Sequence, residues 1–300
     1  MSGALAFTST EAAIVYASRM MEEDRLYFVA IGGPPLLAIL LSKHLRTPNI
    51  AYVVEDGTIA PEMPIPTPPF MIGAGLASSR AVAWTDMNTV DFHAGLGHLD
   101  YGLLAAVQVD AYGNFNSSFL GDDYDRPERR FGGPGGATEI AALCWRTILM
   151  TRLERRKFVS QLDFMSSPGF LDGTPGARER AGMPAETGPY RVVTERAVFG
   201  FDDETRRMKL IAIAPWTSVA EVLGAMEFTP LVAADLARLD LPTEEELAML
   251  RANIDPTGRT ISGEWISLEE TGGRLRRADA GRAAGVPDPH TARAARRRAT

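Results

Sequence analysis

The chain has 300 residues, of which 45% are hydrophobic and 23% are charged, so it can bury a substantial core in one large domain or two smaller ones. This composition excludes a disordered protein, a coiled coil and a collagen-like chain, and no apolar run reaches the length of a membrane-spanning helix. The net charge of −7 combines an acidic body, 1–270, with a basic tail, 271–300, that holds eight Arg and two Asp; an acidic body argues against a broad nucleic-acid-binding face.

The first half of the chain alternates between predicted helices and strands. In chain order these elements are a helix at 10–21, a strand at 26–31, a helix at 36–45 and strands at 50–54, 81–84 and 103–109. The strand–helix–strand unit within 26–54 implies a parallel pair of strands. Ligands of such sheets bind beyond the carboxyl ends of the strands, so we expect 32–35 and 55–57 at a binding edge, close to a Pro-dense loop at 60–70.

The second half holds loops of unusual composition between further elements. In chain order it is predicted to contain a polar, Gly-rich loop at 121–136, a helix at 137–143, a strand at 146–150, a loop-rich stretch at 162–188, a hairpin of strands at 198–201 and 208–213, and helices at 219–226 and 243–253. We therefore expect an α/β fold with an open, mostly parallel sheet flanked by helices, in a single domain over 1–270. The tail, 271–300, lacks a hydrophobic pattern, which indicates a disordered segment or, as the alternative, a docking segment.

Glu55 is the first candidate for chemistry. It follows four apolar residues at the carboxyl end of a predicted strand and precedes Asp56 and Gly57, which permit a tight turn. A glutamate in this place can be a nucleophile, a general base or a cap for the following loop. The Glu-Asp-Gly motif alone does not decide between them, and capping or solvation is the commoner role of an acid at a strand end.

The segment 132–136 is the second candidate, because it reads Gly-Gly-Pro-Gly-Gly directly before a predicted helix. Glycines let a backbone approach a ligand closely, and N–H groups at the start of a helix favour developing negative charge. The segment fits neither the phosphate-binding nor the dinucleotide-binding glycine pattern. It predicts an oxyanion hole, with a flexible turn as the alternative.

Histidine and cysteine point to no metal or disulfide chemistry. His93 and His98 lie five residues apart without a nearby Cys or third His, so a metal site is not expected. Cys144 is the single cysteine, cannot form an internal disulfide and is predicted to pack in the core. Because the N-terminus also lacks a charged start followed by an apolar stretch, we expect a cytoplasmic protein.

Seven blocks of sequence, in the same order along 10–258, resemble the β subunit of family I CoA-transferases, most closely the glutaconate CoA-transferase type. The blocks are VAIGGP (29–34), VVEDG (53–57), DAYGNFNS (110–117), RFGGPGGA (130–137), ERRKF (154–158), SSPGFLDG (166–173) and GPYRVVT (188–194). Each block alone is weak evidence for the family, whereas seven blocks in the same order are specific to it. The tail is not covered.

The resemblance implies that the chain moves CoA from an acyl-CoA to a free acid, with a dicarboxylic acid suggested by the glutaconate type. Glu55 falls on the catalytic glutamate, which would form an acyl-glutamyl anhydride and then a glutamyl-CoA thioester. Gly136 would donate its N–H to the oxyanion, and Gly133 and Gly135 would shape the loop. Asn114 and Asn116 would position that loop or the substrate. CoA is then a substrate, and no cofactor or metal is expected.

The resemblance also implies a partner, an α subunit of the same fold, in an α2β2 or larger heteromer; no nucleic acid or membrane partner is expected. Two residues depart from the family pattern. Pro134 stands where the glutaconate type has serine, which a backbone donor tolerates. Asp56 places a second acid beside Glu55, which would raise the pKa of Glu55 or repel an anionic substrate.

Two other functions remain open. Enzymes of this fold include acyl-CoA hydrolases, among them ring-opening C–C hydrolases, and acyl-CoA decarboxylases; retention of Glu55 favours transfer over both. The second alternative is a non-catalytic subunit that binds a ligand or serves as a scaffold.

Overall fold

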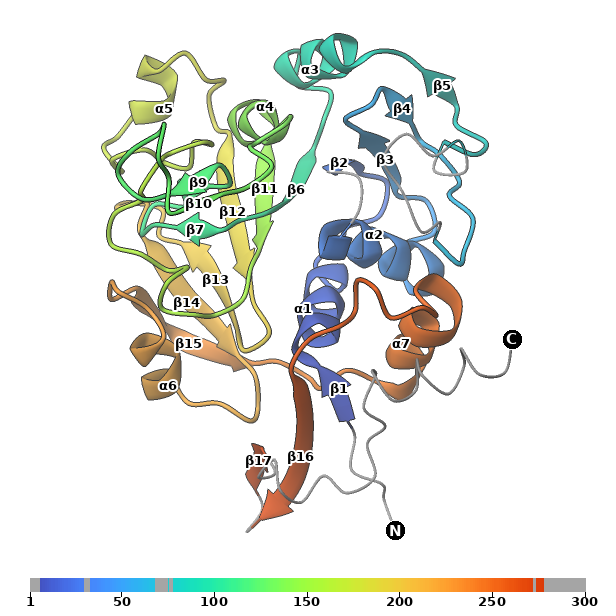
Figure 1. Ribbon diagram of the computed structural model, residues 1–300, viewed down its shortest axis with the longest axis vertical. Helices are drawn as coiled ribbons and strands as arrows, with labels where there is room; N and C mark the ends of the chain where they lie inside the picture. Colours follow the sequence, from blue (N-terminus) through green and yellow to red (C-terminus); the bar gives the residue numbers. More distant parts are fainter. Residues whose placement is uncertain (1–5, 30–32, 68–74, 76–77, 272–273, 278–300) are drawn as a thin grey trace.

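The computed structural model describes residues 6–29, 33–67, 75, 78–271 and 274–277, and one sheet of ten strands dominates this part of the chain (Figure 1). In order across the sheet the strands are β15 (Leu231–Arg238), β14 (Met208–Ile213), β13 (Ala197–Phe201), β12 (Gly188–Val193), β11 (Arg146–Met150), β6 (Tyr101–Ala105), β2 (Leu26–Val29), β3 (Ala51–Val54), β4 (Thr58–Ile59) and β5 (Ala83–Trp84).

The centre of the sheet is parallel, and its margins are mixed. Strands β12, β11, β6, β2 and β3 are parallel neighbours, as are β14 and β15. Strand β13 pairs antiparallel with both of its neighbours, and so does β4. The expected α/β fold with an open, mostly parallel sheet flanked by helices is confirmed, and the parallel centre brings the carboxyl ends of five strands to one edge.

Helices cover both faces of the sheet. The two long ones are α1 (Ser9–Ser18) and α2 (Gly33–Leu45), and the others are α3 (Met87–Gly95), α4 (Ala137–Leu143), α5 (Ala177–Arg180), α6 (Val219–Gly224), α7 (Glu244–Ala248) and the π-helix η1 (Met249–Ile254). One core packs α1, α2, α7 and η1 against side chains such as Tyr27 and Val54. The other packs α3, α4 and α6 against Phe28 and Val53. Successive strand residues thus point into different cores.

Small sheets complete the described part. They pair β1 (Ala6–Thr8) with β16 (Trp265–Thr271) and β16 with β17 (Arg274–Arg277), β7 (Gln108–Val109) with β8 (Phe115–Asn116), and β9 (Phe119–Leu120) with β10 (Arg129–Arg130). The predicted boundary of the domain at residue 270 falls inside the β16–β17 hairpin. The remainder of the tail, 278–300, lies outside the described residues.

Helix α1 begins earlier than predicted because its cap is Thr8. The Thr8 hydroxyl accepts the N–H of Glu11 (3.0 Å), and the Glu11 carboxylate accepts the N–H of Thr8 (2.7 Å), a capping box. Glu11 is almost fully buried and also forms an ion pair with Arg251 of η1 (2.6 Å). The start of α1 is thereby tied to a helix 240 residues further along the chain.

Several predicted elements match the structure closely, and others were missed. Helix α4 and strand β11 have the predicted bounds, whereas the predicted strand at 103–109 divides into β6 and β7. Strands β12 and β15 and helix α3 were not predicted. No helix in the described ranges has both the length and the apolar character needed to cross a bilayer.

Candidate active site

Glu55 lies in the tight turn directly after β3, and its side chain is partly buried. The N–H of Gly57 donates to the carbonyl of Val54 (3.0 Å) and closes the turn. Gly57 has a φ of 96°, and a Cβ there would lie 2.1 Å from the carbonyl oxygen of Thr85, so this position requires glycine. The N–H of Thr85 donates to the Gly57 carbonyl (2.9 Å), which fixes the Glu55 turn to the segment leading into α3.

The glycine loop, residues 132–136, meets Glu55 at its last residue. Gly136 is the N-cap of α4, and a Cβ on Gly136 would lie 3.8 Å from the Cβ of Glu55 and 3.9 Å from the ring of Phe28. Within the described part of the chain, the N–H of Gly136 has no hydrogen-bond acceptor. Gly133 and Gly135 have left-handed φ angles of 87° and 53°, which glycine adopts without strain. The fold therefore places a free backbone donor beside Glu55.

The electrostatic environment of Glu55 is acidic. Burial raises the pKa of Glu55, and the neighbouring carboxylates of Asp56 and Asp91 raise it further. Asp91 belongs to α3, and its own pKa is raised by burial and by Glu139 of α4. These effects all act in the same direction, against the ionised form. A carboxylate formed at Glu55 is poorly stabilised by its surroundings and is therefore a stronger nucleophile than an exposed one.

Asn114 and Asn116 use their side chains in the scaffold. The Asn114 amide donates to Asp110 and to the Leu171 carbonyl, and its oxygen accepts the N–H of Gly169 (2.7 Å). Asn116 is fully buried, and its amide donates to Gln108 (2.8 Å) and to the carbonyl of Phe119 (2.7 Å), just before the segment that leads to the glycine loop. A direct contact of either residue with a substrate would have to replace these bonds. Their role in positioning the substrate stays a prediction.

Two acids of this site, Asp91 and Glu139, were not found from the sequence. Asp91 influences the pKa of Glu55 from α3, which packs against α4 through Val90 and Ala94, and α3 itself has no strong helical pattern. The local sequence thus carried no signal for them beyond the presence of an acid.

The remaining candidates are the histidines His93 and His98 and the single cysteine, Cys144. His93 and His98 are near neighbours, with 3.0 Å between their Nδ1 atoms. In the ranges that the structure describes, no three His, Cys, Asp or Glu side chains gather into a metal site. Cys144 is fully buried in the core beside α4, which confirms its predicted packing role.

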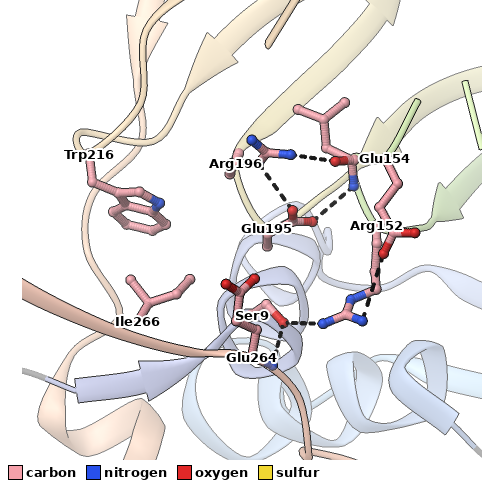
Figure 2. Close-up of a pocket in the computed structure, with 9 residues that line it drawn as sticks. Ser9, Arg152, Glu154, Glu195, Arg196, Trp216, Glu264 and Ile266 are labelled. Atoms are coloured by element: carbon pink, nitrogen blue, oxygen red, sulfur yellow. Dashed lines mark hydrogen bonds and ion pairs between the residues drawn. The ribbon is translucent and has the colours of Figure 1, made fainter. Parts of the chain in front are cut away.

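Two cavities lie elsewhere in the described structure. A cavity of about 330 Å³ lies where β11 and β12 end, next to the start of α1 (Figure 2). Charged side chains of its lining are engaged with other side chains or with the backbone: Arg152 donates to the Ser9 hydroxyl (2.9 Å), and Arg196 pairs with Glu195 (3.2 Å), which accepts the N–H of Leu153 (3.0 Å). A cavity of about 940 Å³ lies between α5 and strands β12 to β15. Neither cavity is lined by a predicted site residue. The first cavity lies between the N-terminal segment and the sheet.

Comparison with known proteins identifies the fold and its family. The family model described as Coenzyme A transferase matches residues 71–225. The B subunit of glutaconate CoA-transferase from Acidaminococcus fermentans is 32% identical over 83% of this chain and 93% of its own length, and the B subunit of 3-oxoadipate CoA-transferase from Pseudomonas knackmussii is 28% identical over 82% and 93%. The crystal structure of glutaconate coenzyme A-transferase from A. fermentans matches with a TM-score of 0.77 and 30% identity, over 85% of this chain and 98% of that chain.

These matches confirm the predicted resemblance to the B subunits of glutaconate-type enzymes and the predicted class of enzyme. They extend over the turn of Glu55, the glycine loop and the sheet that holds both. The chain therefore belongs to the coenzyme A transferase family.

Proposed function

We propose that this chain is the B-type subunit of a heteromeric CoA-transferase and that Glu55 is its nucleophile. The observation that carries the proposal is the pairing of a partly buried carboxyl with the free N–H of Gly136, at the carboxyl end of a parallel strand. A nucleophile and an oxyanion donor that lie beside one another can act on the same acyl carbonyl, as acyl transfer requires. CoA is the substrate, no other cofactor takes part, and the reaction takes place in the cytoplasm.

The reaction begins when a Glu55 carboxylate oxygen attacks the carbonyl carbon of the acyl-CoA. The N–H of Gly136 donates to the oxyanion, the C–S bond breaks, and CoA leaves as a thiolate from an acyl-glutamyl anhydride. The thiolate attacks Cδ of Glu55 and expels the first acid as a carboxylate, which leaves a glutamyl-CoA thioester. The acceptor acid then runs the same two steps in reverse. Both intermediates are activated acyl groups, so the energy of the thioester bond is retained.

A partner subunit of the same fold completes the proposal, in an α2β2 or larger assembly. Several large apolar side chains are exposed on the segment that is hydrogen-bonded to the Glu55 turn: Val82, Trp84, Met87, Phe92 and Leu96. An exposed apolar surface of this kind marks an interaction site. We define residues 82–96 as the docking segment and propose that the partner covers it, keeping water away from the anhydride.

The acyl group proposed is that of a dicarboxylic acid. Both relatives are named for acids with two carboxyl groups, glutaconate and 3-oxoadipate. The acidic surroundings of Glu55 disfavour a second negative charge at the reacting end, so the far carboxylate of such a substrate would be held away from this cluster, on the partner's side.

Exchange kinetics test the proposal. The chain would be produced together with its partner subunit and assayed with acetyl-CoA as donor and glutaconate as acceptor. Glu55→Gln is expected to abolish transfer, and Glu55→Asp to leave at most slow hydrolysis, because the shorter side chain misplaces the anhydride. Glu62→Gln, an exposed acid in a surface ion pair, is the matched control and should transfer at the wild-type rate. If the Glu55→Gln variant transferred CoA at the wild-type rate, Glu55 would not be the nucleophile.

A further inference from the structure

Arg178 is a buried arginine that forms no ion pair with the described part of the chain. It belongs to α5 and is 4% exposed. Its Nε atom has no hydrogen-bond partner among the described residues. Burial lowers the pKa of Arg178 to about 10, so the guanidinium is still charged at neutral pH. Burying a charge without an opposite one is costly, so the groups that this side chain does contact should explain its place.

The hydrogen bonds of Arg178 join the end of α4 to two loops. Its Nη2 atom donates to the carbonyls of Ala141 (3.1 Å) and Ala142 (2.9 Å), both in the last turn of α4. The same atom donates to the hydroxyl of Thr187 (2.9 Å). The Nη1 atom donates to the carbonyl of Gly169 (2.6 Å). One guanidinium therefore fastens the C-terminal end of α4 to the loop that contains Gly169.

The two α4 carbonyls that Arg178 binds lack their usual donors, which are the N–H groups four residues further on. The N–H of Trp145 donates to the carbonyl of Leu99 instead (3.3 Å). The N–H of Arg146 donates to the carbonyl of Asp100 (2.9 Å). Helix α4 also has no basic residue in its own last turn. Arg178 therefore supplies both the missing donors and the positive charge that a helix C-terminus favours.

The other end of α4 carries Gly136, whose N–H lies beside Glu55. The first turn of the helix is fastened by the hydroxyl of Thr138, which donates to the carbonyl of Ser166 (2.7 Å). The helix is also pressed against the sheet, because a Cβ on Gly102 of β6 would lie 2.2 Å from a side chain of α4. Sliding of α4 along its axis would therefore shift the N–H of Gly136 relative to Glu55.

We propose that Arg178 is a positioning residue that holds α4 where the N–H of Gly136 can reach the carbonyl oxygen of the thioester that Glu55 attacks. The inference rests on the proposed function of Glu55 and Gly136. Arg178 acts through the helix and not on the substrate, because the length of α4, about 10 Å, separates its hydrogen bonds from the N–H of Gly136. A displacement of about 1 Å at a reacting centre can cost about 100-fold in rate.

The test measures steady-state transfer from acetyl-CoA to glutaconate by the complex with the partner subunit. Arg178→Met keeps an apolar stem but removes the four hydrogen bonds, so kcat should fall about 10–100-fold. The KM for acetyl-CoA should change by less than about two-fold, because the lost interaction acts in the transition state. Arg178→Lys keeps the charge and should recover part of kcat. Arg180→Met, an exposed arginine of α5 bonded to Thr174 and Pro175, is the matched control and should transfer at the wild-type rate.

A double-mutant cycle with Gly136→Pro separates positioning from a general loss of stability. The φ of Gly136 is −79°, which proline accepts, and the proline variant has no N–H left to position. Adding Arg178→Met to it should therefore lower kcat by less than about three-fold. A loss as large in the Gly136→Pro background as in the wild type would overturn the proposal. Wild-type kcat in a folded Arg178→Met complex would overturn it too.

Circular dichroism and thermal melts of each complex show whether the variants fold. If Arg178→Met does not fold, Arg178→Lys runs the same cycle: a loss of kcat that disappears in the Gly136→Pro background supports the proposal, and an equal loss in both backgrounds, or none in the wild type, contradicts it. If Glu55→Gln retains transfer, the proposed function fails whatever Arg178 does. If Glu55 is essential but the two substitutions act independently, only the role of Arg178 fails.

Discussion

At the scale of single residues, the proposed chemistry depends on a carboxyl and one N–H. Glu55 could be found from the sequence because it follows an apolar strand, and the strand–helix–strand pattern places such an end at a ligand-binding edge. The contact of Glu55 with Gly136 could be expected only through the family resemblance, because 81 residues separate them in the sequence. The acids Asp91 and Glu139 could not be predicted, since their approach depends on the packing of α3 against α4.

The oxyanion role of Gly136 predicts a difference between two substitutions. The φ of Gly136 is −79°, which proline accepts, and its N–H has no acceptor within the described part of the chain. Gly136→Pro should therefore fold but lose the donor, lowering kcat of transfer by about 10²–10³-fold. Gly136→Ala keeps the N–H, and its Cβ would meet Glu55 and Phe28 only at ordinary contact distances of 3.8 and 3.9 Å.

Steady-state transfer assays on both variants check this prediction, with circular dichroism and thermal melts to confirm folding. The alanine variant should stay within about ten-fold of the wild type, since it loses no hydrogen bond. Equal activity of a folded proline variant and the alanine variant would show that this N–H does not stabilise the transition state.

At the scale of elements, local signals explain which segments were predicted correctly. Helix α4 follows the Gly-rich segment 132–136, and β11 ends in a short apolar run, Ile148 to Met150, so both have the predicted bounds. Strand β15 has mostly exposed or partly exposed side chains, and β12 begins with Gly-Pro at the end of a loop-rich stretch, so neither shows a clear strand pattern. Helix α3 buries only Val90 and Ala94, which is too weak a pattern to identify a helix from sequence.

The partly buried ion pair between Glu11 and Arg251 holds α1 to η1 and should be important for stability. Glu11 is 1% exposed and serves both the helix cap and Arg251. Glu11→Ala removes the Glu11 half of the capping box and the carboxylate that pairs with the partly exposed Arg251, so the free energy of unfolding should fall by about 1–3 kcal/mol. Urea denaturation followed by circular dichroism measures this.

The exposed pair of Glu62 and Arg80 is the control for that measurement. Both side chains are largely in solvent, so Glu62→Ala should cost less than about 1 kcal/mol. Similar losses for the two variants would mean that the Glu11 pair does not tie α1 to η1.

At the scale of the whole molecule, the sheet places the Glu55 turn beside a surface that a single chain leaves open. The docking segment, 82–96, includes β5, the last strand of the sheet, and α3 (Figure 1). Strand order and the position of this segment depend on contacts between distant parts of the chain. The sequence could indicate a partner only through the family resemblance, and not where the partner binds.

The proposed partner interface predicts a loss of assembly when the docking segment becomes polar. Trp84 and Phe92 are 66% and 63% exposed, so Trp84→Ser with Phe92→Ser should leave the fold of the isolated chain intact. Loss of two buried aromatic contacts should weaken association with the partner at least about 100-fold. Light scattering of the co-produced subunits across a concentration series measures the change.

Tyr124, 62% exposed on a different loop, supplies the control for that experiment. Tyr124→Ser should leave the assembly unchanged, because this residue lies outside the docking segment. If the double variant assembles as tightly as the Tyr124 variant, the partner binds elsewhere.

The covalent state of Glu55 during turnover tests the central claim most directly. The complex would be mixed with acetyl-CoA, reduced with borohydride and digested, and the peptide 47–80 analysed by mass spectrometry. We predict that Glu55 is reduced to the corresponding alcohol only when acetyl-CoA was present, because borohydride reduces a thioester but not a carboxylate. Continued transfer of CoA with Glu55 recovered unmodified at every time point would contradict the account.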